Sequence, residues 1–418
     1  MVEPNHGVMT TKFAEATVPT TDRAALSARA GFWIVAIAFA VLMAFTTVPT
    51  PLYALYQARD GFPTLVVTAI FAAYAVGVIL GLLFLGHAGD HLGRRPVVLA
   101  VAGVQLLTAI GFTLLSDVAG LLVLRLVSGV AAGVLTSTAT AYLAELRRQW
   151  RPGSPGLAVS VGAAANLGGL ALGPLVSGMV AEWAPVPMVT AYLVLATAII
   201  AVAIPLTRVT ETVEADREGF AVRPQPIAVP AQHRTLYWAA GLGIFTAFAI
   251  TGFYGSVAPA FLGQVLGSHD RLLAGVASTV VFAAAAGAQL GFGHLPMRLQ
   301  LRLGTAAMAV GLIVIAFAGP SASLAAFLGG GAVAGAGLGL MFRGSLAVAS
   351  GLSDGHNHGA VLAGILLIGN AGLAIAPVLV GLSLNWLPIV GVTIGFAAAV
   401  LVLVLWAGPR LARAGRTV

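Results

Sequence analysis

Twelve long apolar runs constrain this chain more than any other feature of its sequence. A helix needs about 20 apolar residues to cross the hydrocarbon core of a bilayer. The runs are continuous and rich in Ala, Leu and Gly, whereas membrane β-strands would alternate apolar and polar residues over about ten positions. We therefore predict an all-α integral membrane protein with twelve transmembrane helices. The spans are expected at about 31–57, 64–86, 96–115, 118–145, 155–182, 187–206, 236–266, 271–293, 302–319, 321–347, 358–384 and 386–408.

The composition excludes several other classes of protein. Only 8% of the residues are charged, whereas a soluble surface needs about a quarter. Cysteine is absent, which excludes disulfides, thiolate zinc sites and iron–sulfur clusters. The net charge of +7 arises from arginines in the loops between apolar runs, so we expect no nucleic-acid partner. No phosphate-binding loop of the G-x-x-x-x-G-K-[ST] type is present, which argues against ATP-driven pumping.

The distribution of basic residues predicts the orientation in the membrane. If the N-terminus is cytoplasmic, 18 of the 21 Lys and Arg residues lie in the tails and the inner loops. The other three are Arg59 and Arg271 in outer loops and Arg125 inside a span. Positive residues concentrate on the cytoplasmic side, so both termini are predicted to be cytoplasmic.

One polar segment divides the twelve spans into six and six. Residues 207–235 carry several charges and three prolines and are predicted to form a cytoplasmic linker. The predicted organisation is a cytoplasmic tail at 1–30, a six-helix bundle at 31–206, this linker, a second six-helix bundle at 236–408 and a cytoplasmic tail at 409–418. The tail at 1–30 lacks the pattern of a cleaved signal peptide.

The two halves share short patterns in the same order. These pairs are Asn166 to Gly178 with Asn370 to Gly381, Gly129 and Gly133 with Gly331 and Gly335, and Pro51 with Pro259. All are separated by close to 204 residues. We infer an internal duplication that gives two pseudo-symmetric bundles. Such bundles can rock about a site between them, which is the architecture of a carrier.

The loop after the second span carries a charged motif, Gly86-His-Ala-Gly-Asp90-His91-Leu-Gly93-Arg94-Arg95. It resembles the G-x-x-x-D-R-x-G-R-R signature of the major facilitator superfamily, from which it departs at His91. The resemblance implies that Asp90 docks near the cytoplasmic end of the eleventh helix and that Arg94 pairs with an acid at the end of the fourth. The expected inner-gate cluster is Gly86, Asp90, Gly93, Arg94, Arg95 and Glu145.

Arg125 is the only charged residue well inside a predicted span. With Gly129 it resembles the superfamily's R-x-x-x-G motif in the fourth helix, and Gly133 follows one turn later. Burying arginine in a membrane is costly, so such residues are usually functional. We expect Arg125 to face the central cavity as a cavity or coupling residue. The alternative is that it extends to the outer interface.

The fifth span contains Gly169, Gly173, Pro174 and Gly178. This pattern resembles the G-x-x-x-G-P-x-x-G-G motif of the drug/proton antiporter branch, with Ser177 in place of the first of the final glycines. Glycines four residues apart allow helices to pack closely, and proline can kink a helix. The resemblance favours efflux.

No acidic residue is predicted at mid-membrane, so the site of proton coupling stays open. Asp90 at the gate could titrate, or Glu182 or Asp117 could reach into the outer vestibule. Alternatively, Arg125 could bind an anionic substrate in a symporter or uniporter. The segment Asp354-Gly-His356-Asn-His358 could sense pH or bind a metal, or it could be a polar loop.

We predict a secondary active transporter that exports small amphipathic molecules, drug-like compounds or metabolites, in exchange for protons by alternating access. The alternative is uptake of a sugar, amino acid or organic anion. We expect a monomer in the cell membrane, no enzyme activity, no cofactor and no metal site. The expected cavity residues are Thr46, Tyr53, Thr136, Asn166, Tyr254 and Asn370.

Overall fold

The computed structural model describes residues 26–415, except 154–155, 217–218 and 353–357. Within this part of the chain, twelve helical segments are long and apolar enough to span a membrane. Their positions agree with the twelve predicted runs. The helices are α1 (Ala28–Thr47), α2 (Pro49–Asp60), α3 (Thr64–Leu85), α4 (Ala88–Leu92), α5 (Arg94–Leu114), α6 (Val118–Trp150), α7 (Gly156–Trp183), α8 (Pro187–Leu206), α9 (Arg234–Leu266), α10 (Arg271–Phe292), α11 (Met297–Ala318), α12 (Leu324–Gly351), α13 (His358–Ser383) and α14 (Ile389–Ala414), with a 3₁₀ turn at Ala231–His233.

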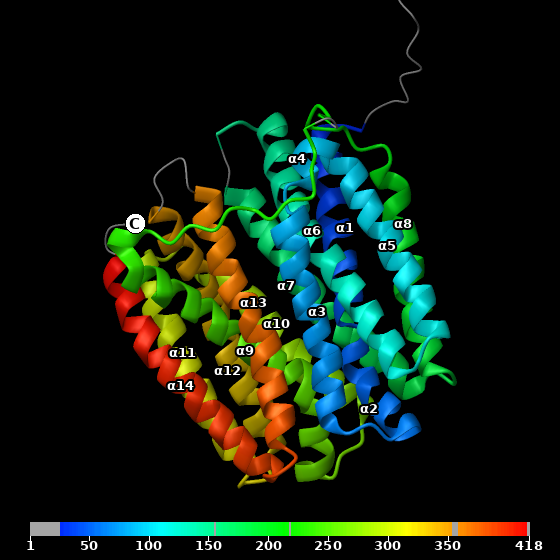
Figure 1. Cartoon of the computed structure of the whole chain (residues 1–418), viewed down its shortest axis with the longest axis vertical. Coiled ribbons are helices and arrows are strands. Elements are labelled where there is room, and N and C mark those ends of the chain that lie inside the picture. Colours follow the sequence, from blue (N-terminus) through cyan, green and yellow to red (C-terminus); the bar gives the residue numbers. More distant parts are fainter. Residues whose placement is uncertain (1–25, 154–155, 217–218, 353–357, 416–418) are drawn as a thin grey trace, which may run out of the picture.

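The helices form two bundles, each with its own apolar core. One core is built from α1 to α8 and the other from α9 to α14. The bundles lie side by side in Figure 1. They meet mainly through α7 against α10 and through α3 against α13. The fold therefore consists of two helical units joined along two helix pairs.

Small residues bring helices into close contact at equivalent places in both bundles. A side chain at Gly129 or Gly133 on α6 would collide with the backbone of α3, and one at Gly335 or Gly339 on α12 would collide with the backbone of α10. The sequence comparison had paired the first two glycines with Gly331 and Gly335. In the structure the equivalent contacts lie one helical turn further along, because Gly331 packs against a tyrosine of α9 instead.

The glycines of α7 serve two different interfaces. Gly169 and Gly173 lie against the backbone of α1. Pro174 and Gly178 face α10, where a Cβ at Gly178 would lie 3.2 Å from the Cα of Gly275. This second contact joins the two bundles. The motif in the fifth span therefore forms packing surfaces, as expected for small residues spaced by four.

The first span is two helices rather than one. Helix α1 ends at Thr47, and α2 begins at Pro49 after the single residue Val48. Proline has no backbone N–H and disrupts the helix before it, and Pro51 repeats the effect. The resulting helix α2 packs against α9 and α10 of the other bundle.

The linker between the bundles crosses from one to the other and is held at both sides. The amide N–H of Gln225 donates to the carbonyl of Leu83 at the end of α3 (2.8 Å), and that of Ala228 donates to the carbonyl of Ala360 at the start of α13 (3.2 Å). Figure 1 shows this extended segment along the upper edge of the molecule. We call this edge the arginine-rich end, because Arg94, Arg148, Arg234, Arg298 and Arg413 lie at helix ends there.

Candidate functional site

A cavity of about 170 Å³ lies between the two bundles. It is lined by residues from α1, α2, α3, α6 and α7 on one side and from α9, α10, α12 and α13 on the other. Both bundles therefore contribute to one site.

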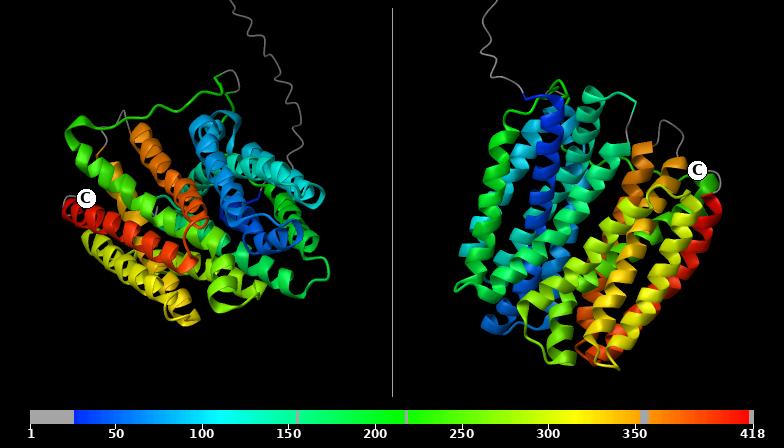
Figure 2. Two further views of the ribbon diagram at one scale, coloured as in Figure 1. Left: turned by 60° about the horizontal axis from the view of Figure 1, so that its bottom comes forward. Right: turned by 180° about the vertical axis from the view of Figure 1, so that it is seen from behind.

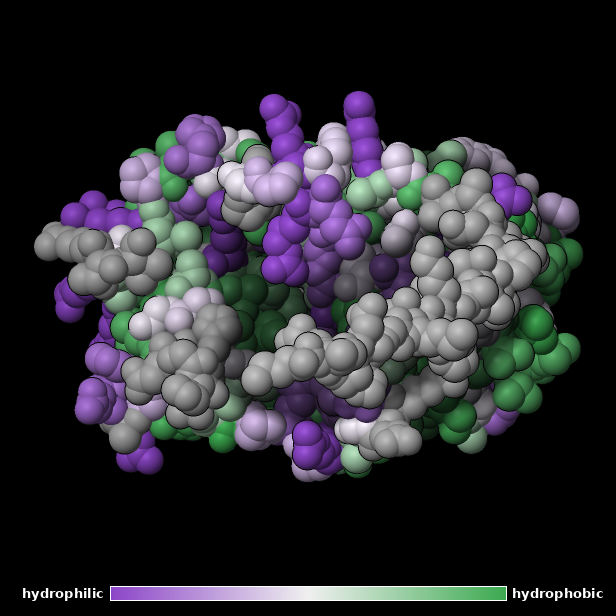
Figure 3. All heavy atoms as spheres, turned by 90° about the horizontal axis from the view of Figure 1, so that it is seen from above, coloured by the Kyte–Doolittle hydropathy of each residue, from purple (hydrophilic) through white to green (hydrophobic). Residues whose placement is uncertain are grey.

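The cavity is closed at the end opposite the arginine-rich end. There the amide N–H of Arg271 donates to Oε2 of Glu182 (3.0 Å), and its guanidinium donates to the carbonyl of Ala181 (3.0 Å). Helix α2 adds contacts with α9 and α10. Towards the arginine-rich end the bundles diverge (Figure 2), and the surface seen from that side is hollowed between them (Figure 3). The site is accessible from the arginine-rich end.

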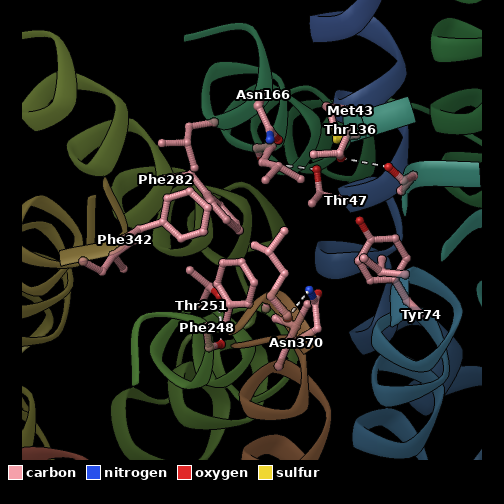
Figure 4. Close-up of a pocket in the computed structure, with 18 of the residues that line it drawn as sticks. Met43, Thr47, Tyr74, Thr136, Asn166, Phe248, Thr251, Phe282, Phe342 and Asn370 are labelled. Atoms are coloured by element: carbon pink, nitrogen blue, oxygen red, sulfur yellow. Dashed lines mark hydrogen bonds between the residues drawn. The ribbon is translucent and has the colours of Figure 1, made fainter. Parts of the chain in front are cut away.

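The two walls of the cavity differ in chemistry. The wall from the first bundle carries Arg125 and several hydroxyl and amide side chains, with Phe71 among them. The wall from the second bundle carries Phe248, Phe282 and Phe342, and two of these rings stack at 5.6 Å between Phe248 and Phe342. Figure 4 shows the three phenylalanines facing the polar residues across the cavity. Asn370, Thr251 and Gln289 add polar groups to the second wall. The cavity is amphipathic across its width.

Arg125 supplies the only charge among the described residues that line this cavity. Its side chain is 2% exposed. One nitrogen donates to the carbonyl of Thr46 (2.6 Å), and the guanidinium lies 4.4 Å from the ring centre of Tyr74 and 5.8 Å from that of Phe71. Its Nε makes no hydrogen bond within the described part of the chain, and no carboxylate there lies within 4 Å. Arg125 is thus buried among helices, and its positive charge has no acidic partner among the residues that the structure describes.

Three of the six expected cavity residues line the cavity. Thr136 and Asn166 belong to the first wall and Asn370 to the second. The hydroxyl of Thr136 donates to the carbonyl of Ala132 (2.8 Å), and the amide of Asn370 donates to that of Leu366 (2.9 Å). The two asparagines that the sequence pattern pairs, Asn166 and Asn370, therefore line the same cavity from opposite bundles.

The other three expected cavity residues lie in helix packing instead. Thr46 is buried, and its hydroxyl donates to the carbonyl of Met43 (2.7 Å). Tyr53 is 1% exposed within the first core. The hydroxyl of Tyr254 donates to the carbonyl of Phe327 (2.6 Å), on whose ring it stacks. The hydroxyls of Thr46 and Tyr254 donate to backbone carbonyls within the bundles, so these side chains can be buried without facing a polar cavity.

Arg94 is the centre of the expected gate cluster. Its side chain is 8% exposed, and it contacts Oε1 of Glu145 at 2.9 Å and Oδ1 of Asp90 at 2.6 Å. The expected pair of Arg94 with the acid at the end of the fourth span is therefore present. Asp90 pairs with Arg94, and its side chain is 55% exposed. Residues 353–357, which precede α13 at the end where Asp90 was expected to dock, lie outside the described residues.

The linker supplies gate residues that the sequence did not reveal. The carboxylate of Glu211 accepts the amide N–H groups of Arg94 and Arg95 at 2.9 Å each, so it caps the start of α5. Thr212 donates its hydroxyl to Oε2 of Glu145 (2.6 Å). Gly93 has φ +91°, and a side chain there would meet Glu211 at 2.9 Å. An acidic residue next to the first turn of a helix in the sequence predicts a cap. Glu211 is more than a hundred residues from α5 in the sequence, so the sequence does not predict this cap.

The other expected members of the gate cluster and the acids predicted at the outer side have the following positions. The guanidinium of Arg95 donates to the carbonyls of Thr207 and Val209 in the linker, and Gly86 ends α3. Asp117 caps α6 by accepting the amide N–H of Gly120 (3.1 Å). Glu182 closes the opposite end, as described above. Asp354, His356 and the side chain of His358 lie outside the described residues.

Comparisons with known proteins agree with this architecture. A family model described as Major Facilitator Superfamily matches residues 35–301. An uncharacterized MFS-type transporter of Mycobacterium tuberculosis is 33% identical over 160 residues, which are 36% of this chain and 26% of that protein. The match therefore spans about a quarter of that relative's length.

Solved structures share the fold over nearly the whole chain. A bacterial homologue of the human lysosomal transporter Spinster, inward-facing and occupied, has a TM-score of 0.65 and 13% identity, covering 94% of this chain and 97% of that one. The human organic anion transporter TETRAN has a TM-score of 0.62 and 17% identity, and the match covers 91% of this chain and 100% of that one. The nucleoside transporter NupG has a TM-score of 0.67 and 9% identity, and the match covers 91% of this chain and 99% of that one. At these identities the likeness shows the fold and no substrate.

Proposed function

The chain belongs to the major facilitator superfamily of membrane transporters, and on this premise we propose that it exports small amphipathic molecules in exchange for protons by alternating access. The observation that carries the proposal is the amphipathic cavity between the bundles. A molecule with one polar end and an aromatic or aliphatic body fits a site with hydroxyl, amide and guanidinium groups on one wall and three phenylalanines on the other.

The route through the protein follows from the two ends of the cavity. The opposite end is closed by α2 and by the contact of Arg271 with Glu182. If the arginine-rich end is cytoplasmic, as the distribution of basic residues predicts, substrate enters from the cytoplasm in this conformation. Rocking of the bundles about the α3–α13 and α7–α10 pairs would then open the opposite end.

Proton coupling is assigned to the gate cluster in this proposal. No carboxylate lines the cavity within the described residues, whereas Asp90 and Glu145 share one arginine at the arginine-rich end. Loss of the contact between Asp90 and Arg94 would shift the balance between gate states. The antiporter-like motif at the α7–α10 interface also favours exchange over uniport.

A second candidate function is transport of an organic anion, by uptake or exchange. It is favoured by Arg125, whose buried charge has no acidic partner within the described residues. A buried unpaired guanidinium is costly, and a carboxylate or phosphate can accept two hydrogen bonds from it. An anionic substrate would complete this pairing.

The test measures accumulation of paired compounds in cells that express the wild-type protein, Arg125→Ala or the control Arg148→Ala. Arg148 is exposed at the end of the same helix, outside the cavity. The panel contains fluorescent amphipathic dyes and aromatic carboxylates with their neutral methyl esters, each with and without a protonophore.

Lower accumulation of dyes with wild type and control, abolished by the protonophore and by Arg125→Ala, would support proton-coupled export. Higher accumulation of a carboxylate but not of its ester would support the organic-anion carrier. No difference among the three strains across the panel would contradict both.

A further inference from the structure

A second groove lies on the second bundle, between α11 and α14, on the side away from the central cavity. These helices pack on each other and on α9, α12 and α13 of the same bundle. The groove has a volume of about 410 Å³ and contains three arginines, Arg298, Arg302 and Arg413. We propose that it binds the headgroup and the upper acyl chain of an anionic phospholipid.

The second half of the chain carries an excess of positive charge. From Arg271 to the end of the chain the sequence holds seven arginines and a single acid, Asp354. Arg302 and Arg413 are exposed, and no carboxylate of the described residues lies within 4 Å of either. The two exposed guanidinium groups, with Arg298 in the same groove, provide a multidentate site for a phosphate.

The groove changes from charged to apolar along its length. Below the arginines it is lined by small and apolar residues, including Ala306, Ala309 and Leu405. From Arg298 to Ala309 is eleven residues, or about 16 Å at the rise of an α-helix. A phosphate at the level of the arginines would therefore place the first part of an acyl chain against the alanines. A soluble anion would leave that apolar part empty.

Local packing explains why the groove is open to lipid. Gly408 brings α14 against Thr305 of α11 near the arginine-rich end, and the alanines beside this contact leave space that larger side chains would fill. Arg410 lies 4.2 Å from the ring centre of Trp406 and donates to its carbonyl (2.6 Å). Tryptophan and arginine together are typical of the membrane interface, which is the depth of a lipid headgroup.

The concentration of arginines at one end follows from topology alone, but topology does not require a groove among them. Arg148 and Arg151 are exposed at the end of α6 and line none of the cavities described above. They provide a matched control, because their removal changes the net charge by the same amount at the same end of the molecule.

The test is native mass spectrometry of the full chain in an uncharged detergent, titrated with dioleoyl phosphatidylglycerol or dioleoyl phosphatidylcholine. We expect phosphatidylglycerol to bind the wild type in preference to phosphatidylcholine. Arg302→Gln with Arg413→Gln should weaken its binding about 25-fold, since each interfacial arginine contributes about five-fold. Arg148→Gln with Arg151→Gln should leave it unchanged.

Two further arms separate the lipid from other anions. Ala306→Phe fills the apolar part of the groove without altering charge, and Ala306 is exposed, so the variant should fold; it should also weaken binding. Glycerol 1-phosphate should not compete at equal concentration. Equal loss in the control pair would show attraction to the whole basic end and would overturn the site. Full competition by glycerol 1-phosphate, or unchanged binding to Ala306→Phe, would overturn the lipid assignment.

Discussion

Replacement of Glu145 by glutamine removes one charge from the gate cluster and tests how the cluster is built. Glu145 contacts Arg94 through both carboxylate oxygens, at 2.9 to 3.3 Å, and also accepts the hydroxyl of Thr212. The arginine side chain is only 8% exposed. After the replacement, Arg94 would keep a single carboxylate partner, Asp90.

The magnitude follows from the burial of each partner. Breaking a buried ion pair costs about 3 to 5 kcal/mol. Asp90 still contacts Arg94, so we expect Glu145→Gln to cost about 3 kcal/mol, or about 6 to 12 °C in melting temperature. The side chain of Asp90 is 55% exposed, and exposed pairs contribute about 1 kcal/mol or less. Asp90→Asn should therefore lower the melting temperature by no more than about 4 °C.

The assay is thermal unfolding of the purified variants in one detergent, together with transport in reconstituted vesicles. We expect both variants to insert into the membrane and both to lose transport, with Glu145→Gln much the less stable. Equal shifts in melting temperature would contradict the assignment of Glu145 as the buried partner. Normal transport by Asp90→Asn would contradict the gating role of that residue.

Three other substitutions test separate parts of the account. If the substrate makes a planar paired contact with the guanidinium of Arg125, Arg125→Lys should not fully support transport, because lysine cannot make that contact; full transport activity in vesicles would contradict such a contact. Gly93→Ala should cost about 1 to 3 kcal/mol, since φ is +91° and the new Cβ would meet Glu211; an unchanged melting temperature would refute the strain. Gly173→Leu should prevent close packing of α7 on Ala44 and lower the yield of folded protein in size-exclusion chromatography, and a normal yield would count against that contact.

The spans could be predicted from the sequence because the bilayer imposes a local requirement. Every helix that crosses it must supply about 20 apolar residues, so the requirement can be recognised without tertiary information. The boundaries are less local. Helix α11 begins at Met297, five residues before the predicted start at Arg302, because its first turn carries Arg298 and lies outside the apolar run.

The cavity could be predicted only in part. Arg125, Asn166 and Asn370 stand out because charged and amide groups are rare in spans. Phe248 and Phe342 do not stand out, because a phenylalanine that faces the cavity has the same kind of apolar neighbours in the sequence as one in the core. These helices carry apolar residues on all of their faces, so the periodicity of the sequence does not identify the face that lines the cavity.

The linker contacts of the gate could not be predicted from spacing. Glu211 caps α5 and Thr212 contacts Glu145 from more than 60 residues away in sequence. Nothing in the linker composition distinguishes these two residues from its other charged and hydroxyl residues. Their role depends on where α8 ends, which places the linker beside the first turn of α5.

The measurement that tests alternating access most directly uses the absence of cysteine from the chain. A single Thr136→Cys variant places a thiol in the cavity. Controls carry a single cysteine at Arg148, at the arginine-rich end, or at Asn385, exposed at the opposite end. Each is treated with a membrane-impermeant thiol reagent in right-side-out and inside-out vesicles.

We predict that each control reacts from one side only and that Thr136→Cys reacts from both sides, with protection by a transported substrate. Reaction of the two controls from different sides would also establish the orientation. Reaction of Thr136→Cys from a single side, with no effect of substrate, would contradict a cavity that opens alternately to the two sides of the membrane.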